Sequence, residues 1–218
     1  MILLKNISFS YPNDDFHLKI NSLHIKAGES IALVGESGSG KSTLMKIISG
    51  EIQTAQGEVI INGEKLHQLN ENKKRVLRLK SMGMILQDSA LLEYLNLQDN
   101  ILFPAKITGH KIEAKTLDEL THTCGIEKLL KKKPLALSEG EKQRAAVCRA
   151  LINSPSIILA DEPTSSLDPK NGDTITHMLI QQCKKNAATL LMITHNERLL
   201  SQFDRVIKLE ELAGANHV

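Results

Sequence analysis

Several short stretches of the chain are apolar at every position, which is typical of strands buried inside a sheet. Ile31–Val34, Ile157–Ala160 and Leu190–Ile193 are the clearest of these runs. Strands of a parallel sheet are covered on both faces, so their sequences show no polar alternation. Asn171–Lys185 lies between the last two runs and is predicted to be the helix that connects them. Together with a final strand at Arg205–Leu209, the pattern predicts an α/β core.

The first third of the chain is predicted to form short strands joined by turns. Leu3–Phe9 and Leu18–Ile25 alternate between apolar and polar residues, and the turn-forming Pro12–Asp15 separates them. Glu58–Ile61 is a further strand, closed by a tight Asn-Gly turn. The apolar Met82–Leu86 is the last strand before the pattern changes.

From residue 88 to residue 151 the spacing becomes helical. Leu117 and Leu120 belong to a periodic stretch that Gly125 ends, and Glu139–Ile152 has no glycine or proline after Gly140. We expect this segment to be a helical subdomain inserted into the core, and the tail 213–218 to be frayed. The predicted single domain 1–218 therefore divides into a core of 1–87 and 152–218 and a subdomain of 88–151.

Composition narrows the class of protein. The chain has 218 residues, 41% of them hydrophobic and 24% charged, with a net charge of +2. It has no apolar run of the ~18 residues that span a bilayer and no signal peptide at its start. Three widely spaced cysteines, Cys124, Cys148 and Cys183, indicate reduced thiols in the cytoplasm. Because aromatic residues are scarce and Trp is absent, nucleic acid is not an expected partner.

A glycine-rich loop follows the first apolar run and matches the phosphate-binding pattern G-x-x-x-x-G-K-[ST]. Its residues are Gly35, Glu36, Ser37, Gly38, Ser39, Gly40, Lys41, Ser42 and Thr43. Backbone N–H groups and a helix N-terminus would cradle phosphate oxygens there. Lys41 is expected at the β- and γ-phosphates, Ser42 on Mg²⁺ and Thr43 on the α-phosphate side. The alternative is an ordinary glycine-rich turn.

A carboxylate pair follows the strand predicted at Ile157–Ala160. Asp161 at a strand tip can hold Mg²⁺, and Glu162 can polarise an attacking water for ATP hydrolysis. The alternative is that both carboxylates only cap the turn at Pro163. Beside a phosphate-binding loop, the catalytic interpretation is favoured.

Two further segments carry a resemblance to a known family. Leu137–Arg144 resembles the signature motif of ABC-type ATPases, and Ser156–Asp168 resembles their Walker B motif and D-loop. The likeness covers essentially the whole chain. It implies that Ser138 and Gly140 contact an ATP held by the opposite protomer of a dimer, and that Asp168 borders the same nucleotide.

The resemblance assigns three more residues. Tyr11 would stack on adenine, Gln87 would be the glutamine that contacts Mg²⁺ or the attacking water, and His195 would touch the γ-phosphate. Each has a simpler alternative. Tyr11 could cover a sheet edge, Gln87 could only end a strand, and His195 could be structural.

The signature departs from the family pattern at two positions. Glu139 replaces its first glycine and Glu141 replaces its glutamine. A carboxylate at 139 would repel a phosphate by about 1 kcal/mol or more unless it points away. This departure raises the question of how fast the composite site turns over.

The segment after Gln87, residues 88–104, resembles the branch that serves lipoprotein-releasing and macrolide-exporting systems. The resemblance implies an α/β P-loop NTPase fold, with a RecA-like core, an N-terminal antiparallel β subdomain and an inserted helical subdomain. It implies a homodimer or heterodimer that binds ATP and Mg²⁺ and drives a separate transmembrane permease, whose helix a groove around Gln87–Asn100 would hold. The chain would then be cytoplasmic and peripheral on the inner face of the cell membrane.

Two other functions stay open from the sequence. One is an ATPase that regulates or remodels a membrane or cell-envelope partner without solute transport, which Glu139 permits. The other is an ATPase acting on nucleic acid or ribosomes. Such proteins usually carry two ATPase units or a long coiled-coil insertion, and this chain has neither.

Overall fold

The computed structural model describes residues 1–12 and 15–212. An N-terminal antiparallel sheet has the strand order β2-β1-β4-β5. Its strands are β1 (Ile2–Ser10), β2 (His17–Ile25), β4 (Gln56–Ile61) and β5 (Glu64–Lys65). Strand β1 shifts register between Lys5 and Ser8 against β4. Gly57 allows this bulge, because a Cβ on it would lie 2.4 Å from the carbonyl oxygen of Asn6.

The second sheet is parallel and has the order β6-β7-β8-β3-β9. Its strands are β3 (Ser30–Val34), β6 (Met82–Ile85), β7 (Ile157–Asp161), β8 (Thr189–Ile193) and β9 (Arg205–Lys208). All five lie where the sequence predicted strands. The predicted parallel α/β core is therefore confirmed.

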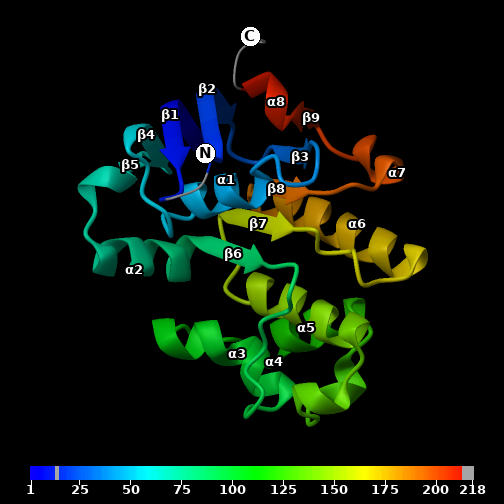
Figure 1. Ribbon diagram of the computed structural model, residues 1–218. Helices are drawn as coiled ribbons and strands as arrows, with labels where there is room; N and C mark the ends of the chain where they lie inside the picture. The colour runs from blue at the N-terminus through cyan, green and yellow to red at the C-terminus, as the bar shows by residue number, and fades with distance from the viewer. Residues whose placement is uncertain (13–14, 213–218) are drawn as a thin grey trace.

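Helices and the antiparallel sheet cover the parallel sheet on both faces (Figure 1). Alternate residues of β7 point to opposite faces, since Leu159 packs with helix α1 (Lys41–Ile48) and β1, whereas Ile158 packs with helix α6 (Pro169–Asn186). Two short helices, α7 (Glu197–Leu200) and α8 (Leu209–Leu212), flank the last strand.

The helical segment packs on the α6 side of the sheet and forms the lower part of the molecule in Figure 1. It contains α3 (Leu97–Thr108), α4 (Ala114–Thr123) and α5 (Glu139–Leu151), with single 3-10 turns at Glu127–Leu129 and Pro134–Ala136. Four consecutive residues of α5, Ala145–Cys148, are fully buried, so the middle of this helix is enclosed on every side. The boundaries at 87/88 and 151/152 stay predictions.

One helix was missed by the sequence pattern. Helix α2 (Glu71–Ser81) stands where only strands and turns were predicted. Most of its residues are charged or polar and it buries just Lys74 and Leu77, so few apolar positions mark it. Polar contacts attach it instead: Arg78 donates to the carbonyls of Ser49 and Gly50, both at 3.2 Å.

Two predictions fall on residues outside the described ranges. These are the centre of the turn at Pro12–Asp15 and the frayed tail at 213–218. No helix within residues 1–12 and 15–212 is long and apolar enough to cross a membrane.

Candidate functional site

The predicted phosphate loop connects β3 to α1 at the carboxyl edge of the parallel sheet. Gly40 is the N-cap of α1 and has a φ of 104°. This positive φ strains any residue with a Cβ, and a Cβ here would lie 2.5 Å from Cζ of Phe16 and push its ring aside, so glycine is favoured. The turn therefore presents its backbone N–H groups at a helix N-terminus, the arrangement that favours an anion.

Lys41 lies inside this loop with only 7% of its surface exposed. Its Nζ donates to the carbonyl oxygens of Gly35 at 3.0 Å and of Glu36 at 2.6 Å. These bonds hold the ammonium across the loop. The hydroxyl of Ser39 is buried and has no hydrogen-bond partner among the described residues. The loop thus offers a fixed cation and a free buried hydroxyl.

Asp161 and Glu162 stand at the tip of β7. Asp161 pairs in register with Ile193 of β8, and β8 in turn pairs with β3, which precedes the loop. Glu162 has a φ of 46°, a left-handed conformation that costs a non-glycine residue about 1 kcal/mol or more. Its Oε1 lies 3.1 Å from Nε2 of His195. Two residues predicted separately as catalytic are therefore in contact.

Tyr11 lies beside the first turn of α1. Its hydroxyl is hydrogen-bonded to Oγ1 of Thr43 at 3.2 Å. Its ring meets Phe9 edge-on at 4.8 Å between centroids and Phe16 at 5.9 Å. This places an aromatic ring at the entrance of the phosphate loop, which the sequence predicted only by position. Stacking on adenine stays a prediction.

The signature segment begins helix α5, away from the phosphate loop of the same chain (Figure 1). Ser138 is the N-cap: Glu141 N–H donates to its Oγ at 3.3 Å, and the Glu141 carboxylate accepts from the Ser138 N–H at 2.7 Å and Oγ–H at 3.0 Å. These bonds hold the pKa of Glu141 below its usual value. Glu139 is 74% exposed and pairs with Lys142 at 2.8 Å.

Gln87 follows β6 and is exposed. It lines a depression of about 410 Å³ that also contains Glu139 and the D-loop residues Ser165 and Ser166. Asp168 caps α6 by accepting from the Asn171 N–H at 3.1 Å, and this bond is the main cause that lowers its pKa. The Gln87 depression thus joins three of the predicted motifs.

Several contacts at the site had no signal in the sequence. Oε1 of Glu210 on α8 accepts from the Glu36 N–H at 3.1 Å, from 174 residues away. Gln143 donates to the carbonyl of Leu86 at 3.1 Å. Arg149 donates to the carbonyls of Ser89 and Ala90 at 2.7 and 2.6 Å. Helix α5 therefore holds the chain on both sides of Gln87. Only the strand order and helix packing bring these residues together.

The parallel sheet, the phosphate loop and the strand-end carboxylates define a P-loop ATPase. The family model described as ABC transporter matches residues 18–165. The chain therefore belongs to the ABC transporter family, as an ATP-binding subunit with ATPase chemistry.

Curated relatives and solved structures agree with this assignment. An uncharacterised ABC transporter ATP-binding protein of Escherichia coli, YbbA, is 40% identical over 86% of this chain and 83% of its own length. The lipoprotein-releasing system ATP-binding protein LolD of Treponema denticola is 40% identical over 85% and 83%. The ATP-binding cassette MJ0796, a dimer bound to ADP and Pi, superposes with a TM-score of 0.88 at 31% identity, over 95% and 94% of the two chains. The resemblance found in the motifs, including a lipoprotein-releasing relative, is confirmed.

Proposed function

We propose that this chain hydrolyses Mg²⁺-bound ATP at two composite sites of a dimer and that the cycle of closing and opening drives a separate transmembrane permease. The contact between Glu162 and His195 carries the proposal. In this contact the Glu162 carboxylate, which can accept a proton from water, meets the His195 side chain, which can contact the γ-phosphate. Both stand at the sheet edge from which the phosphate loop emerges.

The residues of the loop fit ATP. Lys41 supplies a buried positive charge, and the free hydroxyl of Ser39 can donate a hydrogen bond to a phosphate oxygen. Mg²⁺ would be held by Ser42 and Asp161, with Gln87 nearby. Within the described residues no group of three or more His, Cys, Asp or Glu side chains could hold a metal alone. That fits Mg²⁺, which keeps waters and takes substrate phosphates as ligands, and which would supply charge neutralisation at the phosphates.

A second copy is needed to complete each site in this proposal. No hydrogen bond among the described residues joins Ser138–Gly140 to the phosphate loop of the same chain. The solved relative MJ0796 is a dimer. The Ser138 hydroxyl and the α5 N-terminus would then face an ATP bound by the partner. The partner can be a second copy of this chain or another ATPase subunit.

The permease would keep the chain at the inner face of the cell membrane. A helix of the permease would dock beside Gln87–Asn100, a segment that Arg149 and Gln143 tie to the signature helix. Movement at the docking face would therefore reach Ser138 through one rigid helix. This link is what a transporter or a membrane-remodelling ATPase requires.

The test is ATP hydrolysis by the purified chain, alone and with the membrane protein that co-purifies with it. We expect Glu162→Gln to abolish hydrolysis, whereas Glu197→Gln, an exposed glutamate near His195, should retain it. Wild-type hydrolysis by Glu162→Gln would contradict the catalytic assignment. Solute uptake by vesicles that contain the complex separates transport from remodelling.

A further inference from the structure

The carboxylate of Glu210 lies against the start of the phosphate loop, although it comes from α8, far along the chain. Its Oε1 accepts a hydrogen bond from the Glu36 N–H at 3.1 Å. A Cβ placed on Gly35 would lie 2.8 Å from Oε1 and 3.3 Å from Oε2 of this carboxylate. A side chain at position 35 would therefore push the carboxylate away, so glycine is what lets it reach the Glu36 N–H.

Strand register brings the two segments together. Strand β9 runs parallel to β3, and Lys208 lies opposite Val34 where both strands end (Figure 1). Glu36 and Glu210 each stand two residues beyond this pair, so they meet at the same edge of the sheet. Leu209 is buried in the same hydrophobic core as β3, which anchors α8. The backbone that carries Glu210 is thus fixed, although its side chain is exposed.

The peptide that joins Gly35 to Glu36 is held at both of its edges. Its carbonyl oxygen accepts from Nζ of Lys41 at 3.0 Å, and its N–H donates to Glu210 at 3.1 Å. These two groups point in opposite directions in a trans peptide, so two charged side chains hold it from opposite sides. If the bond to Glu210 were lost, the peptide would rotate more easily, because Gly35 has no Cβ to restrict it. A rotated peptide would take one acceptor away from Lys41 and leave the ammonium less firmly placed.

We propose that Glu210 is a positioning residue for ATP, because through the Glu36 N–H it fixes the peptide that holds the Lys41 ammonium inside the phosphate loop. This inference deepens the proposed function and rests on it for the role of Lys41. Glu210 acts here as a hydrogen-bond acceptor, while its negative charge opposes the binding of phosphates. Replacing the carboxylate by an amide separates the two effects, since the amide oxygen can still accept from an N–H.

Three variants test the proposal. Glu210→Gln keeps an acceptor and removes the charge, whereas Glu210→Ala removes both. Glu211→Ala is the matched control, since Glu211 is the next residue of α8, is exposed, and has no hydrogen bond or ion pair with any residue that the structure describes. The first measurement is the dissociation constant of a fluorescent, non-hydrolysable ATP analogue with Mg²⁺. The second is the hydrogen-exchange rate of the Glu36 N–H by NMR, and the third is kcat/KM by phosphate release.

We expect Glu210→Ala to weaken binding of the analogue about fivefold and to lower kcat/KM at least as much. Glu210→Gln should bind the analogue at least as tightly as the wild type, and Glu211→Ala should match the wild type. The Glu36 N–H should exchange about fivefold faster in Glu210→Ala and should stay protected in Glu210→Gln. Because Glu210 is exposed, neither substitution opens a cavity in the core.

Other orders of affinity overturn the proposal. Tighter binding by both Glu210 variants would show that the carboxylate acts on ATP only by repulsion. Equally weak binding by both would show that the acceptor alone does not position the loop. Wild-type affinity of Glu210→Ala, or an unchanged exchange rate of the Glu36 N–H, would show that the contact has no role in ATP binding.

The analogue and the amide exchange report on one chain, so they need neither the dimer nor the permease. Wild-type hydrolysis by Glu162→Gln would remove the proposed function and leave the order of affinities among the Glu210 variants intact. Wild-type affinity of Glu210→Ala, together with loss of hydrolysis in Glu162→Gln, would remove only the role of Glu210. The two failures are therefore distinguishable.

Discussion

Nε2 of His195 lies 3.1 Å from Oε1 of Glu162, although the two residues are on different loops. The pairing of β7 with β8 creates this contact, since Asp161 lies opposite Ile193. Glu162 comes directly after Asp161, and His195 comes two residues after Ile193. Glu162 also donates its N–H to the carbonyl of Ile193 at 3.2 Å. The left-handed backbone of Glu162 is therefore fixed from two sides, which aims its carboxylate before any substrate arrives.

Lys41→Ala is expected to weaken ATP binding and to reduce hydrolysis by about 100-fold or more, because it removes the ammonium held inside the phosphate loop. Lys46→Ala is the matched control, since Lys46 lies exposed at the other end of α1. Binding of a fluorescent ATP analogue and phosphate release measure the two effects. Normal hydrolysis by a folded Lys41→Ala protein would refute the phosphate-loop assignment.

Glu162→Gln should bind ATP and then accumulate as a dimer, because the amide keeps the shape of the side chain but loses the charge that polarises water. The amide can still contact His195. Size-exclusion chromatography with light scattering, with and without Mg-ATP, measures the change of mass. A strictly monomeric Glu162→Gln protein at high concentration would count against the two-site dimer.

Tyr11→Ala is expected to raise the Michaelis constant for ATP about tenfold and to change turnover little, because stacking acts equally on bound substrate and transition state. Tyr11→Phe removes only the hydroxyl that meets Thr43 and should resemble the wild type. Steady-state kinetics with ATP and GTP measure both variants. An unchanged Michaelis constant in Tyr11→Ala would show that this ring is structural and does not stack on adenine.

Lys142→Ala should slow hydrolysis, because it removes the cation that neutralises the Glu139 carboxylate within the signature. Charge repulsion of about 1 kcal/mol corresponds to roughly fivefold. Glu139→Gly should be as fast as the wild type or faster, and the double variant should recover what Lys142→Ala loses. ATPase rates measured against protein concentration test this, since the effect requires the dimer. Coincident curves for all four proteins would show that the carboxylate points away from the bound phosphate.

Glu141→Ala should lower the free energy of unfolding at neutral pH by less than about 1 kcal/mol, because it removes half of the cap on Ser138. The folded pKa of Glu141 is lowered, so the carboxylate stabilises the protein above its unfolded pKa. This contribution is lost as the pH falls through the lowered value. Urea unfolding at pH 7 and at acidic pH should therefore show a difference between wild type and variant that shrinks with acidity. A difference that does not depend on pH would exclude the charged cap as its cause.

The sequence alone determined the features that neighbouring residues encode. The phosphate loop needs glycine at positive φ, a lysine and a hydroxyl within one short stretch, so Gly40 to Thr43 could be assigned directly. The buried strands were equally visible, because two-sided burial leaves no polar position in Ile31–Val34.

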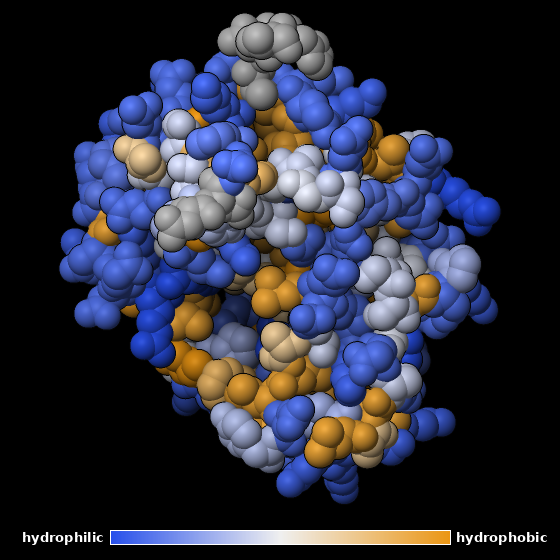
Figure 2. All heavy atoms as spheres, in the orientation of Figure 1, coloured by the Kyte–Doolittle hydropathy of each residue, from blue (hydrophilic) through white to orange (hydrophobic). Residues whose placement is uncertain are grey.

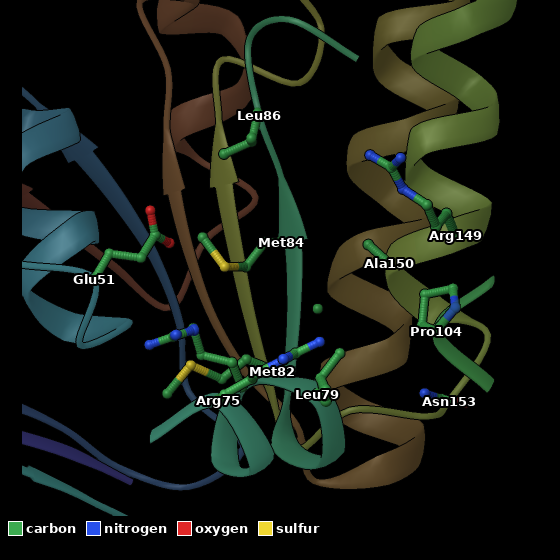
Figure 3. Close-up of a pocket in the computed structure, with 12 residues that line it drawn as sticks. Glu51, Arg75, Leu79, Met82, Met84, Leu86, Pro104, Arg149, Ala150 and Asn153 are labelled. Atoms are coloured by element: carbon green, nitrogen blue, oxygen red, sulfur yellow. The ribbon is translucent and has the colours of Figure 1, made fainter. Parts of the chain in front are cut away.

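Tertiary structure decided every relationship that depends on strand order and polar docking. The contacts of Glu162 with His195 and of Glu210 with Glu36 follow from which strands lie side by side, and hydrophobic patterns do not specify that order. Helix α2 buries only Lys74 and Leu77 and is also held by Arg78 on carbonyl oxygens, so few apolar positions mark it in the sequence. For the same reason the open cavity of about 350 Å³ beside β6 (Figure 2 and Figure 3) could not be predicted, because its walls come from α2, β6, α3 and α5, which only packing brings together.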